Sequence, residues 1–568
     1  MARAARRLAG AVCAQGRPRV GVRTLLALAA ALNLASMSAA VWSIGAPPPV
    51  TAQVAGNVGQ ARARIADLAD YIERSMPDWD LPGLAVGVVY RDEVIFLGGF
   101  GVKELGRDDP IDAETLFQIG SVSKSFAAGA VGALVDDGLV DWDDPVVEHL
   151  PWFRVKDPWI TRGMTIRDIL SHRSGMPGGA YPVLAVMDAR EAAERLRLPD
   201  NQAPLRQGYR YSNQGYGVAG LVVEAVTGMT WGEWVRERIF TPLGMHRSAA
   251  SPYEVWDDRF VATAFLGTAP AGTVSIADAP GLNIAMPHGF ARDGSRRVLS
   301  WQSYDSMQAA GSVVSSVADL VKWIRMHLGG GRLDGEVVMQ EATVAEMQAP
   351  QVHMEGSAAA APLADGGRAA YGLGWSLNSF EGHRYVSHSG GIFGFPAYVG
   401  MLPEAEAGVT VLANGSMWTP YYPHREIAAW VFARLLGAPE RDWHGEIMAR
   451  TREIEAQVEA ALAAQDAARI PGTAPSLPLE RYTGSYEHEY GGQAHVELND
   501  EGGLRVHFGQ PGSFSGDMEH WHHDVFRLYY DGGDGQAYGS SFVTFTLGPQ
   551  GSVSRMDMGF MGRYRRTG

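Results

Sequence analysis

Apolar and polar positions fall into two patterns along the chain, and each pattern predicts a different kind of element. One apolar run early in the chain and three later ones have the composition of β-strands. The early run is interrupted once, at Arg91-Asp92, which predicts two strands joined by a tight turn. These strand-like runs occupy 83–104, 383–391, 396–403 and 407–415.

Helical patterns lie before and between these runs. A short helix is predicted around 61–74, and a longer one begins near Ser121 and stops at Gly138. Helices and loops then fill roughly 140–375. Strands at both ends of a helical middle predict an α+β or three-layer domain whose sheet is built from both ends of the segment.

The pattern changes near residue 470. A long amphipathic helix is predicted over 445–470, followed by a Pro-rich linker at 471–480. Short alternating segments separated by Gly/Asp turns then predict a small antiparallel barrel of about 90 residues. These segments lie at 494–499, 504–509, 525–530 and 542–548.

The first 52 residues have the features of an export signal. Several arginines precede an apolar run from Leu25 to Ala46, and Val50-Thr51-Ala52 has the small-residue pattern of a signal-peptidase site. We therefore expect cleavage after Ala52 and a periplasmic or secreted protein. The apolar run is also long enough to stay as a membrane tether, since about 20 apolar residues span a bilayer.

Charge and cysteine content narrow the function. The 568-residue chain has a net charge of −15 and no Lys/Arg-rich cluster, so nucleic acid is not an expected partner. Its single cysteine, Cys13, excludes an intrachain disulfide framework and leaves no cysteine in the body of the chain for catalysis. Nothing in the sequence predicts a cofactor or sets the oligomeric state.

The helix that begins near Ser121 carries the first candidate for chemistry. Ser121 and Lys124 are three residues apart and therefore lie on one helical face. Lys124 is one of four lysines among 48 Lys and Arg, and lysine, unlike arginine, can lose its proton and act as a base. The pair predicts a serine nucleophile with its base. Taken alone, it also fits a helix-capping serine followed by a solvated lysine.

A second motif has residue types that such a nucleophile needs. Tyr211 and Asn213 stand where a polar stretch enters a predicted helix. A phenol can relay a proton, and an amide can orient both a lysine and a substrate. Taken alone, the motif also fits an ordinary turn with a packed tyrosine.

A third motif, His388-Ser389-Gly390, ends a predicted strand before a glycine-rich turn. Small residues there would let a substrate lie along the strand edge. The backbone N–H of Gly391 could then pair with that of Ser121 as an oxyanion hole. Taken alone, the histidine fits a packed or surface side chain.

In their order and spacing, the three motifs resemble those of the serine β-lactamase and penicillin-binding superfamily. The tyrosine motif is similar to that of the class C branch and its esterase and D-aminopeptidase relatives, peptidase family S12. The resemblance covers roughly 60–435, and the C-terminal segment resembles the lipocalin-like barrel appended to some members. It implies a three-layer αβα domain with a central antiparallel sheet, followed by a small antiparallel β-barrel domain. The agreeing stretches include "LFQIGSVSKSF", "IRDILSHRSGMP", "TPLGMHRS" and "AAGSVVSSVADLVKW".

The resemblance implies a role for each matching residue. Ser121 would form an acyl-enzyme, and Lys124 and Tyr211 would share the proton transfers. Asn213 would hold Lys124 and the substrate, and the amides of Ser121 and Gly391 would form the oxyanion hole.

The strand motif departs from the class C pattern. That branch usually has Lys-Thr-Gly where this chain has His388, Ser389 and Gly390, which would bind and orient the substrate. A lysine charge helps to hold the carboxylate of a β-lactam, and a mostly neutral histidine holds it less firmly. The resemblance therefore implies small peptides, amides or esters as substrates rather than efficient β-lactam hydrolysis.

These expectations combine into one reading of the chain. We expect a serine hydrolase with a small-molecule or short-peptide substrate. The alternative is a catalytically weak protein that binds β-lactams or peptidoglycan fragments, or an assembly protein that uses the barrel as its contact module. The expected parts are a signal peptide or anchor (1–52), the hydrolase domain (53–440), a helix and linker (441–478) and the barrel (479–568).

Two further groups of histidines carry weaker signals. His520, His522 and His523 make a metal site conceivable, but no further ligand is evident in the sequence, so no metal is predicted. His172 follows the helix-like segment 165–170 and is expected to stabilise the local turn.

Overall fold

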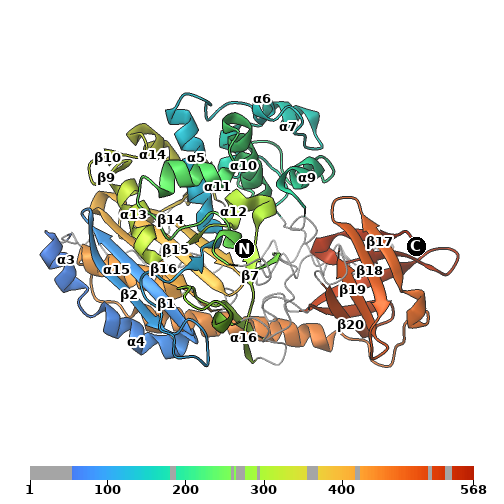
Figure 1. Ribbon diagram of the computed structural model, residues 1–568. Coiled ribbons are helices and arrows are strands. Elements are labelled where there is room, and N and C mark those ends of the chain that lie inside the picture. Colours follow the sequence, from blue (N-terminus) through green and yellow to red (C-terminus); the bar gives the residue numbers. More distant parts are fainter. Residues whose placement is uncertain are drawn as a thin grey trace, which may run out of the picture. The chain divides into compact units, whose positions relative to one another are not determined.

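An eight-stranded antiparallel sheet forms the core of the first domain of the computed structural model, in the order β11-β12-β13-β14-β15-β16-β1-β2 (Figure 1). The early strand β1 and the late strand β16 are neighbours, with Leu84 opposite Ala413. This pairing confirms that both ends of the segment build one sheet. The strands are β1 (Gly83–Tyr90), β2 (Glu93–Gly101), β11 (Val352–His353), β12 (Ala370–Tyr371), β13 (Ser376–Phe380), β14 (His383–Ile392), β15 (Phe395–Leu402) and β16 (Ala407–Ala413).

The structure describes most of the chain, and the expected signal segment 1–52 lies outside the described residues. Within the described ranges, no helix combines the length and the apolar composition that crossing a membrane requires. The described residues are 54, 56–178, 187–256, 261–263, 275–290, 295–354, 369–415, 423–508, 515–530 and 540–568.

Helices cover both faces of the sheet. On one face, α5 (Ser123–Asp136) and α13 (Val317–Leu328) share a buried cluster with sheet residues such as Val399. On the other, α4 (Leu68–Trp79) and α15 (Pro423–Leu436) pack with residues such as Val411. Strand β1 is buried along its whole length because both of its faces are covered. The three layers are those of the predicted αβα domain.

The turn and the helix predicted around the first strands are confirmed. Arg91 and Asp92 have φ of +48° and +61°, the left-handed values that a two-residue turn between twisted strands requires. The helix near Ser121 opens with a 3₁₀ turn, η2 (Gly120–Val122), continues as α5 and ends before Gly138, whose φ is +69°.

Helices and short strands fill the predicted helical middle. Helix α10 (Asn213–Thr227) begins where Ser212 Oγ accepts a hydrogen bond from the Gly215 amide, and it ends at Gly228 in the left-handed region. The other α-helices of this part are α6 (Val146–His149), α7 (Pro158–Gly163), α8 (Ile166–Leu170), α9 (Ala189–Glu194), α11 (Trp231–Val235), α12 (Gln308–Gly311) and α14 (Glu341–Met347).

Two helix predictions need correction. The segment 61–74 is not one helix but parts of two, α3 (Val58–Arg64) and α4, with a break at 65–67 where Ile65 leaves the helical region. Helix α16 (Trp443–Ala467) exists, but it is not amphipathic: Trp443 and Thr451 are its buried residues. Apolar residues of its second half, such as Val458 and Leu462, are about half exposed, so no apolar stripe of this helix is buried along its length.

Eight antiparallel strands close the C-terminal barrel, as predicted. Strand β17 pairs with the last strand, β24, with Tyr486 opposite Arg566. Alternate side chains point inward and are buried, among them Phe508, Phe545 and Met556, so side chains fill the interior. The strands are β17 (Gly484–His488), β18 (Gly492–Leu498), β19 (Leu504–Phe508), β20 (Ser515–His522), β21 (Val525–Tyr530), β22 (Ser540–Leu547), β23 (Val553–Asp557) and β24 (Arg563–Arg566).

Candidate active site

Ser121 lies in the 3₁₀ turn that leads into α5, and two polar groups converge on its hydroxyl oxygen. Lys124 Nζ lies 2.9 Å from Ser121 Oγ, and the Tyr211 hydroxyl lies 2.8 Å from the same oxygen. Tyr211 is 90 residues further along the chain, just before α10. The fold therefore brings the first two predicted motifs into direct contact at one oxygen atom.

Lys124 has no exposed surface. Burial lowers the pKa of its amine well below the ordinary value, because the charged form would lose its hydration. Its Nζ also donates a hydrogen bond of 2.8 Å to the carbonyl oxygen of Ala310 in α12. The amine is thus positioned by a backbone group and favoured in its neutral form, which is the form that can accept a proton.

Burial has the opposite effect on the protonation of Tyr211. It raises the pKa of the phenol, because the anion would be poorly solvated, and the hydrogen bond with Ser121 lowers it by less. The hydroxyl therefore keeps its proton at neutral pH. Lys124 Nζ lies 4.8 Å from the centre of the Tyr211 ring, so both groups are close to the serine and to each other.

Asn213 opens helix α10, two residues after Tyr211. Among the described residues, the hydrogen-bond partners of Lys124 Nζ are Ser121 Oγ and the Ala310 carbonyl, and Asn213 is not one of them. The orienting role of Asn213 stays a prediction. The carbonyl of Ala310, 186 residues from Lys124 in sequence, was missed because a backbone acceptor leaves no mark in the residue types.

Strand β14 passes directly beside the turn that carries Ser121. A Cβ atom added to Gly390 would lie 1.9 Å from the Ile119 carbonyl oxygen, and one added to Gly120 would lie 2.6 Å from the amide nitrogen of Gly391. Gly120 also has a φ of +49°. Such an approach is open only to glycine, and it places the predicted oxyanion donor Gly391 beside the serine turn.

His388 is buried and held by two internal contacts. Its Nε2 lies 2.9 Å from the Tyr371 hydroxyl, and its Nδ1 lies 2.6 Å from the carbonyl oxygen of Ser389. Burial, first, and the nearby Lys124 lower the pKa of His388 to about 3. The ring is therefore neutral, with Nδ1–H donating to the carbonyl and Nε2 accepting from Tyr371.

A family model described as beta-lactamase matches residues 68–434, more than half of the chain. The chain belongs to the β-lactamase family. The matched region contains the Ser121, Tyr211 and His388 motifs. A second model, described as a domain of unknown function (DUF3471), matches residues 468–566 and covers the barrel.

Curated relatives share this β-lactamase-family region. Unguisins hydrolase ungD′ of Aspergillus campestris is 28% identical over 435 residues, which are 74% of this chain and 76% of that protein. Penicillin-binding protein 4 of Amycolatopsis lactamdurans is 29% identical over 367 residues, 63% of this chain and 85% of its own.

Solved structures extend the likeness of fold to about 90% of the chain. The octameric penicillin-binding protein homologue from Pyrococcus abyssi has a TM-score of 0.56 at 22% identity, over 88% of this chain and 99% of its own. A crystal structure of SurE has a TM-score of 0.52 at 21% identity, over 90% of this chain and 100% of its own. At these identities the likeness concerns the fold alone.

The β-lactamase-family domain contains a further residue at the site, His172. Its ring is fully buried, lies 4.3 Å from the Tyr211 ring, and accepts a hydrogen bond of 3.1 Å from the Ser212 amide at Nδ1. The Arg210 amide donates to the His172 carbonyl at 2.7 Å. His172 thus contacts the chain on both sides of Tyr211, more than the predicted local turn alone.

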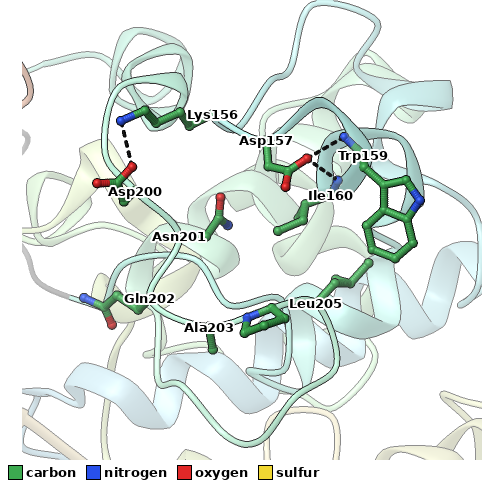
Figure 2. A pocket seen from close by; sticks show the side chains of 10 residues that line it. Lys156, Asp157, Trp159, Ile160, Asp200, Asn201, Gln202, Ala203 and Leu205 are labelled. Atoms are coloured by element: carbon green, nitrogen blue, oxygen red, sulfur yellow. Dashed lines mark hydrogen bonds and ion pairs between the residues drawn. The ribbon is translucent and has the colours of Figure 1, made fainter.

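A pocket of about 560 Å³ lies elsewhere on this domain, and none of the catalytic candidates lines it (Figure 2). Asp157 caps α7 by accepting from the Trp159 amide at 2.7 Å, and Lys156 forms an ion pair of 2.7 Å with Asp200. The three charged side chains that line it are therefore engaged with other groups of the protein.

The histidines of the barrel are also engaged locally. His520 Nε2 lies 3.0 Å from the His523 carbonyl oxygen, and His522 Nδ1 accepts from the Ile470 amide at 3.4 Å. In the parts of the chain that the structure describes, no three His, Cys, Asp or Glu side chains come together as metal ligands would.

Proposed function

We propose that this chain is a serine hydrolase that forms an acyl-enzyme on Ser121 and acts on small peptides, amides or esters. The observation that carries the proposal is the convergence of Lys124 Nζ and the Tyr211 hydroxyl on Ser121 Oγ, at 2.9 and 2.8 Å. A nucleophile held by a base and by a second proton carrier is the arrangement that covalent acyl transfer needs.

The opposite pKa shifts of Lys124 and Tyr211 support the following proton transfers. The neutral Lys124 amine accepts the proton of Ser121 as Oγ attacks the carbonyl carbon. The amides of Ser121 and Gly391 receive the oxyanion. Tyr211 gives its proton to the leaving group as the bond breaks, and Lys124 returns a proton to Tyr211. A water molecule, deprotonated by the same pair, then attacks the acyl-enzyme, and Oγ leaves with a proton.

The relatives support this reaction class and a broad range of substrates. One is named a hydrolase of unguisins and others are named penicillin-binding proteins. The neutral His388 in place of the lysine usual in class C enzymes favours the S12 peptidases and esterases over the β-lactamases. A D-aminopeptidase, D-Ala peptidase or esterase activity is therefore proposed.

Covalent labelling tests the proposal. Intact mass after exposure to a fluorophosphonate should show a single adduct on the wild-type protein and none on Ser121→Ala. An adduct on both proteins would place the reactive group elsewhere. No adduct on either, in folded protein, would favour the alternative of a weak binding or assembly protein.

Export is proposed from the sequence of residues 1–52. The arginine-rich start, the apolar run and the site after Ala52 support a periplasmic or secreted location, with a membrane tether if cleavage does not occur. The intact mass of the protein recovered from cells distinguishes the form cleaved after Ala52 from the uncleaved, tethered form.

A further inference from the structure

His388 and Tyr371, near the serine, are hydrogen-bonded to each other, and we call them the closed pair. Tyr371, in β12, is fully buried and donates its hydroxyl hydrogen to His388 Nε2 at 2.9 Å. The other ring nitrogen of His388 is occupied by the Ser389 carbonyl at 2.6 Å. Both nitrogens are thus used inside the protein, and only 5% of the histidine surface is exposed.

The pair lies on the face of the sheet that carries the reaction. Gly390, two residues after His388 on β14, faces the turn at Ile119, and alternate strand residues share a face. The His172 ring, which packs on Tyr211, also lies 4.8 Å from the Tyr371 ring. Tyr371 and His388 therefore belong to the packed wall around the proton-transfer groups.

The amine at the serine is equally unable to bind an anion. Lys124 is fully buried, and its Nζ is directed to Ser121 Oγ and to the Ala310 carbonyl. A carboxylate that left water here would meet a neutral imidazole with no free N–H and a buried amine. Removing a charge from water without a partner is costly.

We propose that the active site selects acyl donors with no free carboxylate near the scissile bond, and that Tyr371 sets this selection by occupying the Nε2 atom of His388. The substrate class is then uncharged esters and peptides whose carboxyl group is blocked, amidated or joined in a ring. The inference rests on the proposed function, since it concerns the substrate of the acyl-enzyme reaction at Ser121.

A matched pair of esters tests the selection. 3-(Methoxycarbonyl)phenyl butyrate and 3-carboxyphenyl butyrate have the same acyl group and similar leaving groups, and they differ in one negative charge. The kcat/KM ratio of the two, corrected for their hydroxide rates, should favour the uncharged ester about tenfold or more in the wild-type protein, because neither His388 nor Lys124 replaces the lost hydration of the carboxylate. A corrected ratio below about threefold would overturn the inference.

Variants separate the closed pair from general packing. His388→Lys introduces a cation and should lower the ratio about tenfold or more. Tyr371→Phe frees Nε2 to take a proton, so its ratio should fall as the pH is lowered from 8 to 5 while that of the wild type stays level. Tyr398→Phe is the matched control, because Tyr398 is buried and lies opposite Ser389, on the other face of the sheet. An unchanged ratio in both His388→Lys and Tyr371→Phe would also overturn the assignment.

The two proposals fail in different ways. If neither ester is hydrolysed and Ser121 takes no fluorophosphonate, the serine hydrolase proposal fails and the inference with it. If the uncharged ester is hydrolysed and the carboxylate ester is hydrolysed equally well, the hydrolase stands and only the selection by Tyr371 is wrong.

Discussion

Replacing Gly390 by alanine tests the contact on which the predicted oxyanion hole depends. The new Cβ would lie 1.9 Å from the Ile119 carbonyl oxygen and 3.0 Å from the Val122 amide nitrogen. Ordinary carbon–oxygen contacts are above about 3 Å, so strand β14 and the Ser121 turn must separate by about 1 Å. The Gly391 amide lies next to this contact and moves with the strand.

The expected cost follows from the loss of one oxyanion donor. Such a loss, or a misplacement of about 1 Å, lowers kcat about 100-fold or more. The assay is hydrolysis of an uncharged aryl ester by the Gly390→Ala protein, with thermal unfolding by circular dichroism to show that the variant is folded. Gly120→Ala approaches the same contact from the other side, at 2.6 Å from the Gly391 nitrogen, and should give the same result.

Gly163→Ala is the control for this prediction. A Cβ at Gly163, the last residue of α7, meets only Leu205 at an ordinary 3.5 Å, so activity should stay at the wild-type level. A folded Gly390→Ala protein whose kcat is within about threefold of the wild type would refute the reasoning, because the strand could not then form half of the oxyanion hole.

Three further predictions concern Lys124 as the base, His172 beside Tyr211, and His444 in helix α16. Lys124→Arg should lower kcat about 1,000-fold, since a guanidinium cannot accept the serine proton. The acid limb of the wild-type pH–rate profile should lie well below the ordinary lysine pKa. Activity retained in Lys124→Arg would exclude Lys124 as the base. His172→Phe should lower kcat about 100-fold with a smaller change in KM, because it removes the hydrogen-bond acceptor beside Tyr211. His172→Asn keeps an acceptor and should recover most of the loss. Equal losses in both variants would mean that His172 acts only by packing. His444 in α16 lies 3.0 Å from Glu426 and 2.9 Å from Asp78, and hydrogen bonding to Glu426, the largest cause, raises the pKa of His444 from 6.5 to about 9. The stability that His444 contributes is therefore complete below pH 6.5 and is lost as the pH rises to 9. The difference in Tm between wild type and His444→Gln should shrink over this range, and a constant difference would show that these ion pairs do not stabilise the fold.

The strand and helix patterns could be predicted from local sequence, and so could the nucleophile. Ser121 and Lys124 are three residues apart, so one helical turn is enough to bring them together. The tight turn at Arg91-Asp92 and the alternation of the barrel strands likewise depend on neighbours in the chain. Such features follow from backbone geometry and need no information about the rest of the fold.

Helix α16 shows where the sequence was insufficient even locally. The segment 445–470 was predicted to be an amphipathic helix, yet its apolar residues Val458 and Leu462 are about half exposed. A stripe is buried only where another element supplies a matching face, and that depends on tertiary packing.

The sequence by itself determined which residues could do chemistry: a serine, a lysine, a tyrosine and a histidine in three motifs of the β-lactamase family. Tertiary structure decided what state each of them is in. The Ala310 carbonyl that positions Lys124 and the Tyr371 hydroxyl that closes His388 come from separate elements, and burial alone shifts the lysine and tyrosine pKa values in opposite directions. The contact between Lys124 and Ala310, 186 residues apart, and the loss of water around a charge arise only when the chain has folded. No pattern of neighbouring residues could therefore predict them.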